Sequence, residues 1–299
     1  MRADPNYISS LALSIDHSSS VADTLTTELS SGLRVASLQD DPVAAARSSL
    51  MGSAIAKDDT FVQTASSEAS MLQVTDTTLG EVVTQLTSAL SLAVQGNDET
   101  LNAANMTAIM QQLTGIRDQV LSLANTSYLG SSLFAGSQGS VKPFVLDTST
   151  TPATVNYVGD TNVQYLETPT GQKIQVNLPG SAVFGTSSSG VFGALNQLIA
   201  DYSSGASTAT FTADTSALTA SLGQVSQQRS ILDSSLSRVQ STSTYAQTDE
   251  SQLKANQGTL VAADTASVAT QLSSQETQYQ ALLNVMSALQ KTDLFDYLN

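Results

Sequence analysis

The stretch SSGLRVASLQDDPVAAA, Ser30 to Ala46, interrupts an amphipathic helical pattern and then restarts it. An apolar stripe leads into Gly32, and glycine commonly closes a helix in the left-handed conformation. Asp41 followed by Pro42 has the form of an N-cap with proline at the first helical position. The sequence therefore predicts two N-terminal helices joined by a short connector.

We assign the connector to five residues: Gly32, Arg34, Asp40, Asp41 and Pro42. Gly32 would supply the backbone freedom of the break, and Asp41-Pro42 would restart the helix in a new direction. Arg34 lies near both aspartates in the sequence. These residues are equally consistent with an ion pair that fixes the break and with an exposed arginine.

Apolar residues recur at heptad-like spacing in three further seams. The first comprises Phe61, Ala65, Leu72, Leu79, Val82, Leu86, Ala89 and Ala93, and the second Ile109, Leu113, Ile116, Val120 and Leu123. The third comprises Leu218, Leu222, Val225, Arg229, Leu232, Leu236 and Val239, of which Arg229 is the one charged member. Such spacing is typical of helices that bury one face against other helices. It predicts helix up to about Gly136 and again from about Asp214 to the end of the chain.

The terminal segments carry the candidate assembly residues. These are Leu25 and Leu29 near the N-terminus, and Val261, Val268, Leu272, Tyr279, Leu282, Met286 and Leu289 near the C-terminus. One helix cannot bury such a stripe by itself, so we expect the C-terminal helix to pair with the N-terminal one, running antiparallel. Two thin helices would then gain most of their burial from neighbouring copies or other subunits.

The middle of the chain has a different character. Four prolines punctuate it, and the runs TVNYVGD, VQYLE and KIQVNL alternate like short strands. The expected fold is therefore mainly α with a small inserted β domain: an elongated rod of long helices whose terminal helices form an antiparallel coiled coil. The expected division is 1–42 (inner coiled coil and connector), 43–140 and 214–256 (helical rod), 141–213 (outer β-rich domain) and 257–299 (inner coiled coil).

Composition narrows the class of protein. The 299 residues carry a formal net charge of −15, which argues against nucleic acids and anionic membranes as partners. Only 12% of residues are charged and 5% aromatic, a mixture that suits thin helical rods better than a compact enzyme. Cysteine is absent, so disulfides and thiolate chemistry are excluded. The N-terminus lacks an apolar run of signal-peptide length, which predicts either a cytoplasmic protein or export without a cleaved signal.

No group of residues assembles a catalytic site. His17 is the single histidine, and the adjacent pairs Asp40-Asp41 and Asp58-Asp59 would point apart on a helix instead of converging on one ion. We therefore expect no catalytic, cofactor-binding or metal-binding residues, and no enzyme activity. A secreted enzyme such as a peptidoglycan hydrolase would need a convergent acidic or zinc-binding set.

The segment 30–46 resembles the N-terminal signature of the flagellin superfamily, in which a terminal helix ends in a Ser-Gly-hydrophobic-Arg run. Its Asp-Asp-Pro-Val-Ala-Ala form is more similar to the hook-associated junction proteins (FlgL type) of that superfamily than to flagellin itself. Similar stretches follow at SLANTSYLGSSLFAGSQGSVKPF, NYVGD, IQVNLPGSAVFG, VFGALNQLI and the final LFDYLN. A generic coiled-coil adhesin would not account for the ordered signature at 30–46.

The resemblance implies a secreted structural subunit of the extracellular bacterial flagellum, an adaptor at the hook–filament junction that docks by folding its terminal helices. It further implies export by the flagellar type III apparatus without a cleaved signal. The implied partners are other copies in a ring, a neighbouring hook-associated protein, flagellin and, before secretion, an export chaperone. The alternative within the superfamily is a flagellin that forms the filament itself.

Overall fold

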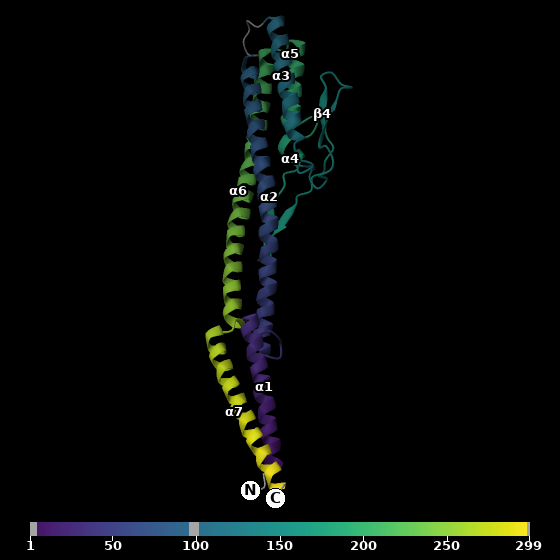
Figure 1. Ribbon diagram of the computed structural model, residues 1–299. Coiled ribbons are helices and arrows are strands. Elements are labelled where there is room, and N and C mark those ends of the chain that lie inside the picture. Colours follow the sequence, from purple (N-terminus) through teal and green to yellow (C-terminus); the bar gives the residue numbers. More distant parts are fainter. Residues whose placement is uncertain (1–4, 96–101, 298–299) are drawn as a thin grey trace. The chain divides into compact units, whose positions relative to one another are not determined.

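The computed structural model describes residues 5–95 and 102–297 (Figure 1). Within these residues the chain forms the helices α1 (Pro5–Ser31), α2 (Pro42–Gln95), α3 (Ala103–Ala124), α4 (Gly180–Phe184), α5 (Gly190–Ser204), α6 (Thr208–Val261) and α7 (Thr265–Tyr297). The strands are β1 (Ser127–Tyr128), β2 (Ser131–Ser132), β3 (Phe144–Asp147), β4 (Thr154–Tyr157), β5 (Tyr165–Glu167) and β6 (Lys173–Gln175). The prediction of a mainly helical fold with a small strand-containing insertion is confirmed.

The chain divides into two compact units. The terminal unit consists of the segments up to Ala56 and from Asp249 onward, and the central unit is Lys57–Thr248. Both long helices, α2 and α6, contribute to each unit. The finer five-part division expected from the sequence remains a prediction.

The core of the central unit follows the predicted seams. The first seam in α2 is buried along its whole length, because all eight of its residues pack into one hydrophobic cluster. Leu113 and Val120 of α3 and Leu218, Val225, Leu232 and Val239 of α6 are buried in the same cluster. Arg229, the charged member of the third seam, leaves the core and pairs with Asp76 of α2 at 2.6 Å.

The strands form three antiparallel two-stranded sheets, β1–β2, β3–β4 and β5–β6. The three alternating runs of the sequence correspond to β4, β5 and β6, whereas β1, β2 and β3 were not predicted. Phe144 on β3 packs edge-on against Phe184 of α4, with ring centroids 5.3 Å apart, and lies close to Phe192 of α5 and Tyr157 of β4. This aromatic cluster fixes the insertion to the helices.

Two helix boundaries differ from the sequence prediction. The helical region ends at Ala124 instead of near Gly136, because the Asn125 side chain pairs with the backbone of Phe144. Its Nδ2 donates to the Phe144 carbonyl at 3.0 Å, and its Oδ1 accepts from the Phe144 N–H at 2.9 Å. The last part of the chain begins its helix earlier than Asp214, at Thr208.

Candidate assembly site

The predicted connector forms in the terminal unit at residues 32–41, between α1 and α2. Gly32 has a φ of +70°, and its N–H donates to the Glu28 carbonyl at 2.8 Å. The left-handed backbone explains why glycine stands at this position. Asp41 Oδ1 accepts from the N–H groups of Val43 (3.1 Å) and Ala44 (3.0 Å), and α2 begins at Pro42. The predicted cap with proline in the first turn is therefore confirmed.

Asp40 shapes the loop by a different route. Its Oδ2 accepts from the N–H groups of Ser37 at 2.8 Å and Ala36 at 3.0 Å. These backbone bonds, Ser37 first, lower the pKa of Asp40 below its ordinary value because they stabilise the carboxylate. The two adjacent aspartates thus have separate tasks, one closing the loop and the other starting the helix.

A second break lies opposite the first, and the sequence did not reveal it. The expected continuous C-terminal helix is interrupted at 262–264, between α6 and α7, and Asp264 Oδ1 caps α7 by accepting from Ala266 and Ser267. The prediction of unbroken helix to the end of the chain was wrong. The reason is that the side chain and backbone at Asp264 satisfy the N–H groups that a new helix leaves unpaired.

The two breaks are joined by backbone hydrogen bonds. The Arg34 N–H donates to the Val261 carbonyl at 2.8 Å, and the Ala263 N–H donates to the Gly32 carbonyl at 2.9 Å. Leu33 and Ala262 form an antiparallel bridge between these bonds. Val261, expected in the coiled-coil seam, instead belongs to this junction, where its carbonyl is an acceptor.

Arg34 takes part in the junction through both of its guanidinium ends. Its Nη2 donates to the Leu260 carbonyl at 3.1 Å, and its Nη1 lies 3.8 Å from Asp41 Oδ2. Both side chains of the ion pair are partly exposed, so the pair contributes little by itself. The bond to Leu260 joins segments that lie 226 residues apart in the chain.

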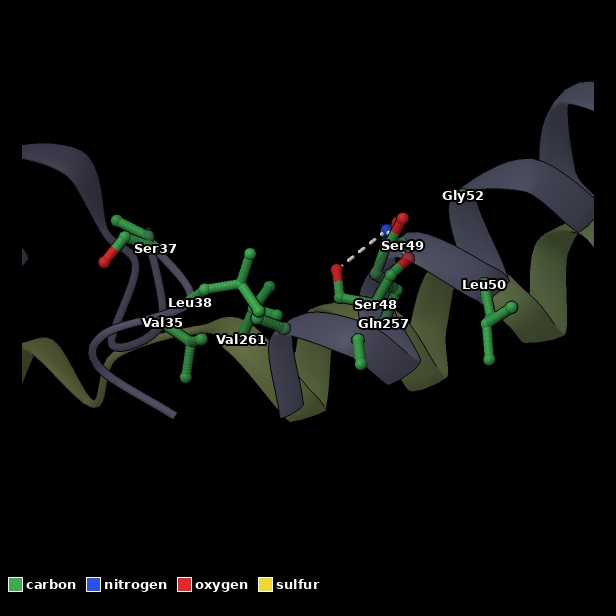
Figure 2. Close-up of a pocket in the computed structure, with 12 residues that line it drawn as sticks. Val35, Ser37, Leu38, Ser48, Ser49, Leu50, Gly52, Gln257 and Val261 are labelled. Carbon is green, nitrogen blue, oxygen red and sulfur yellow. Dashed lines mark hydrogen bonds between the residues drawn. The ribbon is translucent and has the colours of Figure 1, made fainter. Parts of the chain in front are cut away.

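An apolar groove of about 790 Å³ lies beside this junction (Figure 2). Its walls come from residues 35–38, 45–46, 48–50, 52, 257 and 261. Gln257 closes the floor between α6 and α2, since its Nε2 donates to the carbonyl and hydroxyl oxygens of Ser48 at 2.9 and 3.1 Å. Leu38 and Leu50, at either end of the groove in Figure 2, remain 68% and 72% exposed.

The terminal helices α1 and α7 pack side by side and antiparallel, as predicted (Figure 1). Ser18 of α1 donates to Gln275 Oε1 of α7 at 3.3 Å, whereas the later residue Leu33 meets the earlier residue Ala262. Their shared core is thin: the buried apolar side chains of α1 and α7 are Leu11, Leu25 and Val268, among the residues whose side chains are described.

The other candidate assembly residues differ in how far they are exposed to solvent. Leu272, Tyr279, Leu282 and Met286 are half-buried, Leu29 is 38% exposed, and the side chain of Leu289 lies outside the described residues. Further apolar side chains of the same helices face outward, among them Leu13 and Val285. The pair therefore presents apolar surface that its own packing does not cover.

Sequence reasoning missed Leu38, Leu50, Gln257 and Asp264. The Asp-Thr pair at 264–265 was a readable N-cap signal, but the heptad spacing continues across it. The groove residues carry no local signal, because they meet only when the two breaks are brought together. Within the described residues, no cluster of three or more potential metal ligands occurs. None of the described helices is long and apolar enough to cross a membrane.

Comparison with known proteins identifies the family. The profile of the bacterial flagellin N-terminal helical region matches residues 6–139, and that of the C-terminal helical region matches residues 215–298. This chain belongs to the flagellin superfamily. The two matched regions flank strands β3–β6 and include the helices that carry the junction and the terminal pair.

Two curated proteins similar to this chain are hook-associated proteins. Flagellar hook-associated protein 3 of Salmonella typhimurium is 29% identical over 118 residues, and that of Escherichia coli is 28% identical over the same length. The match covers 39% of this chain and only 37% of each relative.

The similarity in fold to solved structures extends over a larger part of the chain than the sequence matches do. A structure assigned as a flagellar hook-associated protein of Vibrio parahaemolyticus gives a TM-score of 0.64 at 18% identity, covering 74% of this chain and 99% of that one. The flagellar junction protein FlgL of Legionella pneumophila gives 0.59 at 16% identity, covering 73% and 100%.

Proposed function

We propose that this chain is a structural, non-catalytic subunit of the bacterial flagellum and that it acts as an adaptor at the hook–filament junction. Membership of the flagellin superfamily supports a structural role, and the names of the similar proteins favour the hook-associated branch. The observation that carries the mechanism is the exposed apolar groove beside the two joined breaks.

Assembly would be driven by surface that the free chain leaves in water. Fully burying one leucine side chain contributes about 1.5–3 kcal/mol, so covering Leu38 and Leu50 would supply a substantial part of a docking energy. The outward-facing residues of α1 and α7 would add to it. In the proposed assembly one face of a subunit would meet a different face of the next, which is a heterologous contact.

The proposal extends to partners and location. Other copies in a ring, a neighbouring hook-associated protein and flagellin would cover the terminal unit, and an export chaperone would hold it before secretion. The chain would reach the extracellular flagellum by type III export. Nucleic acids and membranes have no part in it, since a net charge of −15 repels polyanions and anionic lipid surfaces.

Incubation of the purified chain under salting-out conditions, with and without fragments of hook and filament, tests the role. Negative-stain electron microscopy is expected to show the chain bound at fragment ends without elongation, and no long filaments from the chain alone. Long filaments formed without seeds would contradict the adaptor role and make the chain a flagellin.

The groove can be tested with the same assay. Leu38→Asp and Leu50→Asp each place a charge on a side chain that is already exposed, so the free chain should keep its helical circular dichroism and solubility. We expect at least a tenfold loss of end binding, because docking would bury that charge. Leu129→Asp is the matched control: Leu129 is 89% exposed in the β1–β2 turn and is not among the residues that line the groove. Unchanged end binding by both groove variants would exclude the groove as a docking surface.

A further inference from the structure

The groove of the terminal unit adjoins an exposed side of α2. Val43, Arg47 and Leu50 follow one another at spacings of four and three residues, so they lie on one side of the helix. Val43 is 61% exposed, Leu50 is 72% exposed, and Arg47 between them is exposed as well. Leu50 also lines one end of the groove (Figure 2), so the groove and this side of α2 meet at that residue. These three residues, the α2 face, set a positive charge between two uncovered apolar side chains.

Arg47 is the unpaired cation of this surface. Arg34 donates to the Leu260 carbonyl, and Lys254 pairs with Glu250 at 2.5 Å. Among the lysine and arginine side chains that the structure describes in the terminal unit, Arg47 is the one without an ion pair or a hydrogen bond. Its guanidinium can therefore form charge-assisted hydrogen bonds with a carboxylate of a partner.

The outward side of α1 has the complementary pattern. Leu13 is 70% exposed, and Asp16, three positions later, is exposed on the same side of the helix. Leu50 and Arg47 are separated by the same three positions, in the opposite direction along α2. An α1 helix that ran antiparallel to α2 would therefore bring its leucine to Leu50 and its aspartate to Arg47 at the same time.

The charges of α1 favour such a contact. Its acidic residues are Asp16, Asp23 and Glu28, and α1 contains neither lysine nor arginine. Because the chain has a net charge of −15, two copies repel each other unless opposite charges are brought together. An unpaired arginine flanked by apolar side chains accommodates both the carboxylate and the exposed leucine of an acidic helix.

We propose that the α2 face and the adjoining end of the groove bind the outward side of α1 from a second copy, with Asp16 paired to Arg47 and Leu13 packed beside Leu50. Within one copy α1 packs on α7 through its other side, which leaves Leu13 and Asp16 free for this contact. Two different faces meet, so repetition of the contact closes the copies into a ring. The inference rests on the proposed structural role, because it names the faces by which copies of the subunit meet.

Disulfide cross-linking tests which faces meet, and each introduced thiol is unique because the chain has no cysteine of its own. The proposed antiparallel pairing places Ser20, four residues after Asp16, opposite Val43 of the other copy. A tagged Val43→Cys chain, concentrated and mixed with an untagged Ser20→Cys chain under a mild oxidant, should form the mixed disulfide. Ser10→Cys is the matched control and should not form it, since Ser10 lies on α1 about 15 Å from Ser20.

Charge reversal tests the ion pair. Arg47→Glu and Asp16→Arg should each weaken self-association about tenfold in sedimentation velocity, because each variant sets like charges against each other. The double variant exchanges the two charges at an unaltered net charge, and it should regain most of the loss. Lys142→Glu and Asp59→Arg are the matched controls: they change the net charge as much as the single variants, at exposed side chains of the central unit, and should leave association unchanged.

The assignment of these faces is wrong if the Ser10 and Ser20 variants cross-link equally, or if the double charge variant associates no better than the single ones. It is also wrong if the unaltered chain stays monomeric at about 1 mM. End binding to hook and filament fragments, measured on the same variants, tests the proposed function separately. Self-association through these faces without end binding would contradict the adaptor role alone, whereas end binding without such association would contradict only the assignment of the faces.

Discussion

The two units of this chain are built from the same long helices but differ in what those helices bury. In the central unit α2 and α6 share a continuous core with α3, α5 and the inserted strands, and the largest side chains are fully enclosed. In the terminal unit the helices α1 and α7 face each other with little else to cover them. The difference separates a unit with a continuous core from a unit whose core is thin, and which the proposed function would have partners complete.

The difference also explains the distribution of aromatic residues. Phe134, Phe144, Phe184 and Phe192 gather in the central unit, where rings 5–6 Å apart supply much of the buried area. The terminal helices are rich in alanine, serine and isolated leucines, and their buried apolar side chains, among those described, are Leu11, Leu25 and Val268. Helices of this composition can pair, but the isolated pair has low stability in water because it buries little apolar surface.

The largest expected effect separates the two cores by the same substitution. Leu79→Ala, at a fully buried position of α2, should lower the free energy of unfolding of the central unit by about 3 kcal/mol, and its Tm by about 6–12 °C. Leu25→Ala in α1 should cost less than half as much, because neighbours that are half-exposed can close over the gap. Urea denaturation followed by circular dichroism measures both, and equal losses would contradict the proposed contrast.

Local chemistry decided which parts of the fold could be read from the sequence. The cap at Asp41 and the turn at Gly32 were predictable because each depends on the residue's own side chain or backbone. The seams of α2 and α6 were predictable because a helical period needs no knowledge of the partner. Strand β3 was not, since Phe144 pairs with a residue thirteen positions along the chain and with Asn125 behind it.

The site was readable only on its N-terminal side. The Arg34 side chain donates to a backbone carbonyl 226 residues further along the chain, and no local sequence pattern predicts this hydrogen bond. The break at 262–264 was hidden because Val261 and Val268 keep the seven-residue spacing of an unbroken helix. The junction therefore combines one half that short-range signals specify and another that only the tertiary pairing of the two ends specifies.

A smaller effect is expected at the turn of the connector. Gly32→Val should cost about 1–2 kcal/mol in the terminal unit, because a branched side chain is strained at a φ of +70° although nothing lies within 4 Å of the new Cβ. Gly32→Asn tolerates this conformation and should behave almost like the parent chain. The readout is end binding to flagellar fragments beside the solubility of the free chain. The proposed role of the connector predicts that Gly32→Val impairs the first much more than the second.

The smallest expected effect tests the division of labour between the adjacent aspartates. Asp41→Ala removes the cap of α2 and should destabilise the terminal unit by about 1 kcal/mol, whereas Asp41→Asn or Asp41→Ser should restore most of the loss. Asp40→Ala should instead free the loop at 36–37 and leave the first turn of α2 intact. Hydrogen exchange at the Val43 and Ala44 amides, compared with exchange at the Ala36 and Ser37 amides, distinguishes the effects of the two substitutions.

Each variant should accelerate exchange at its own pair of amides, because each carboxylate accepts from a different pair. Acceleration at all four amides in both variants would show that the connector opens as a single unit and that the two carboxylates share one task.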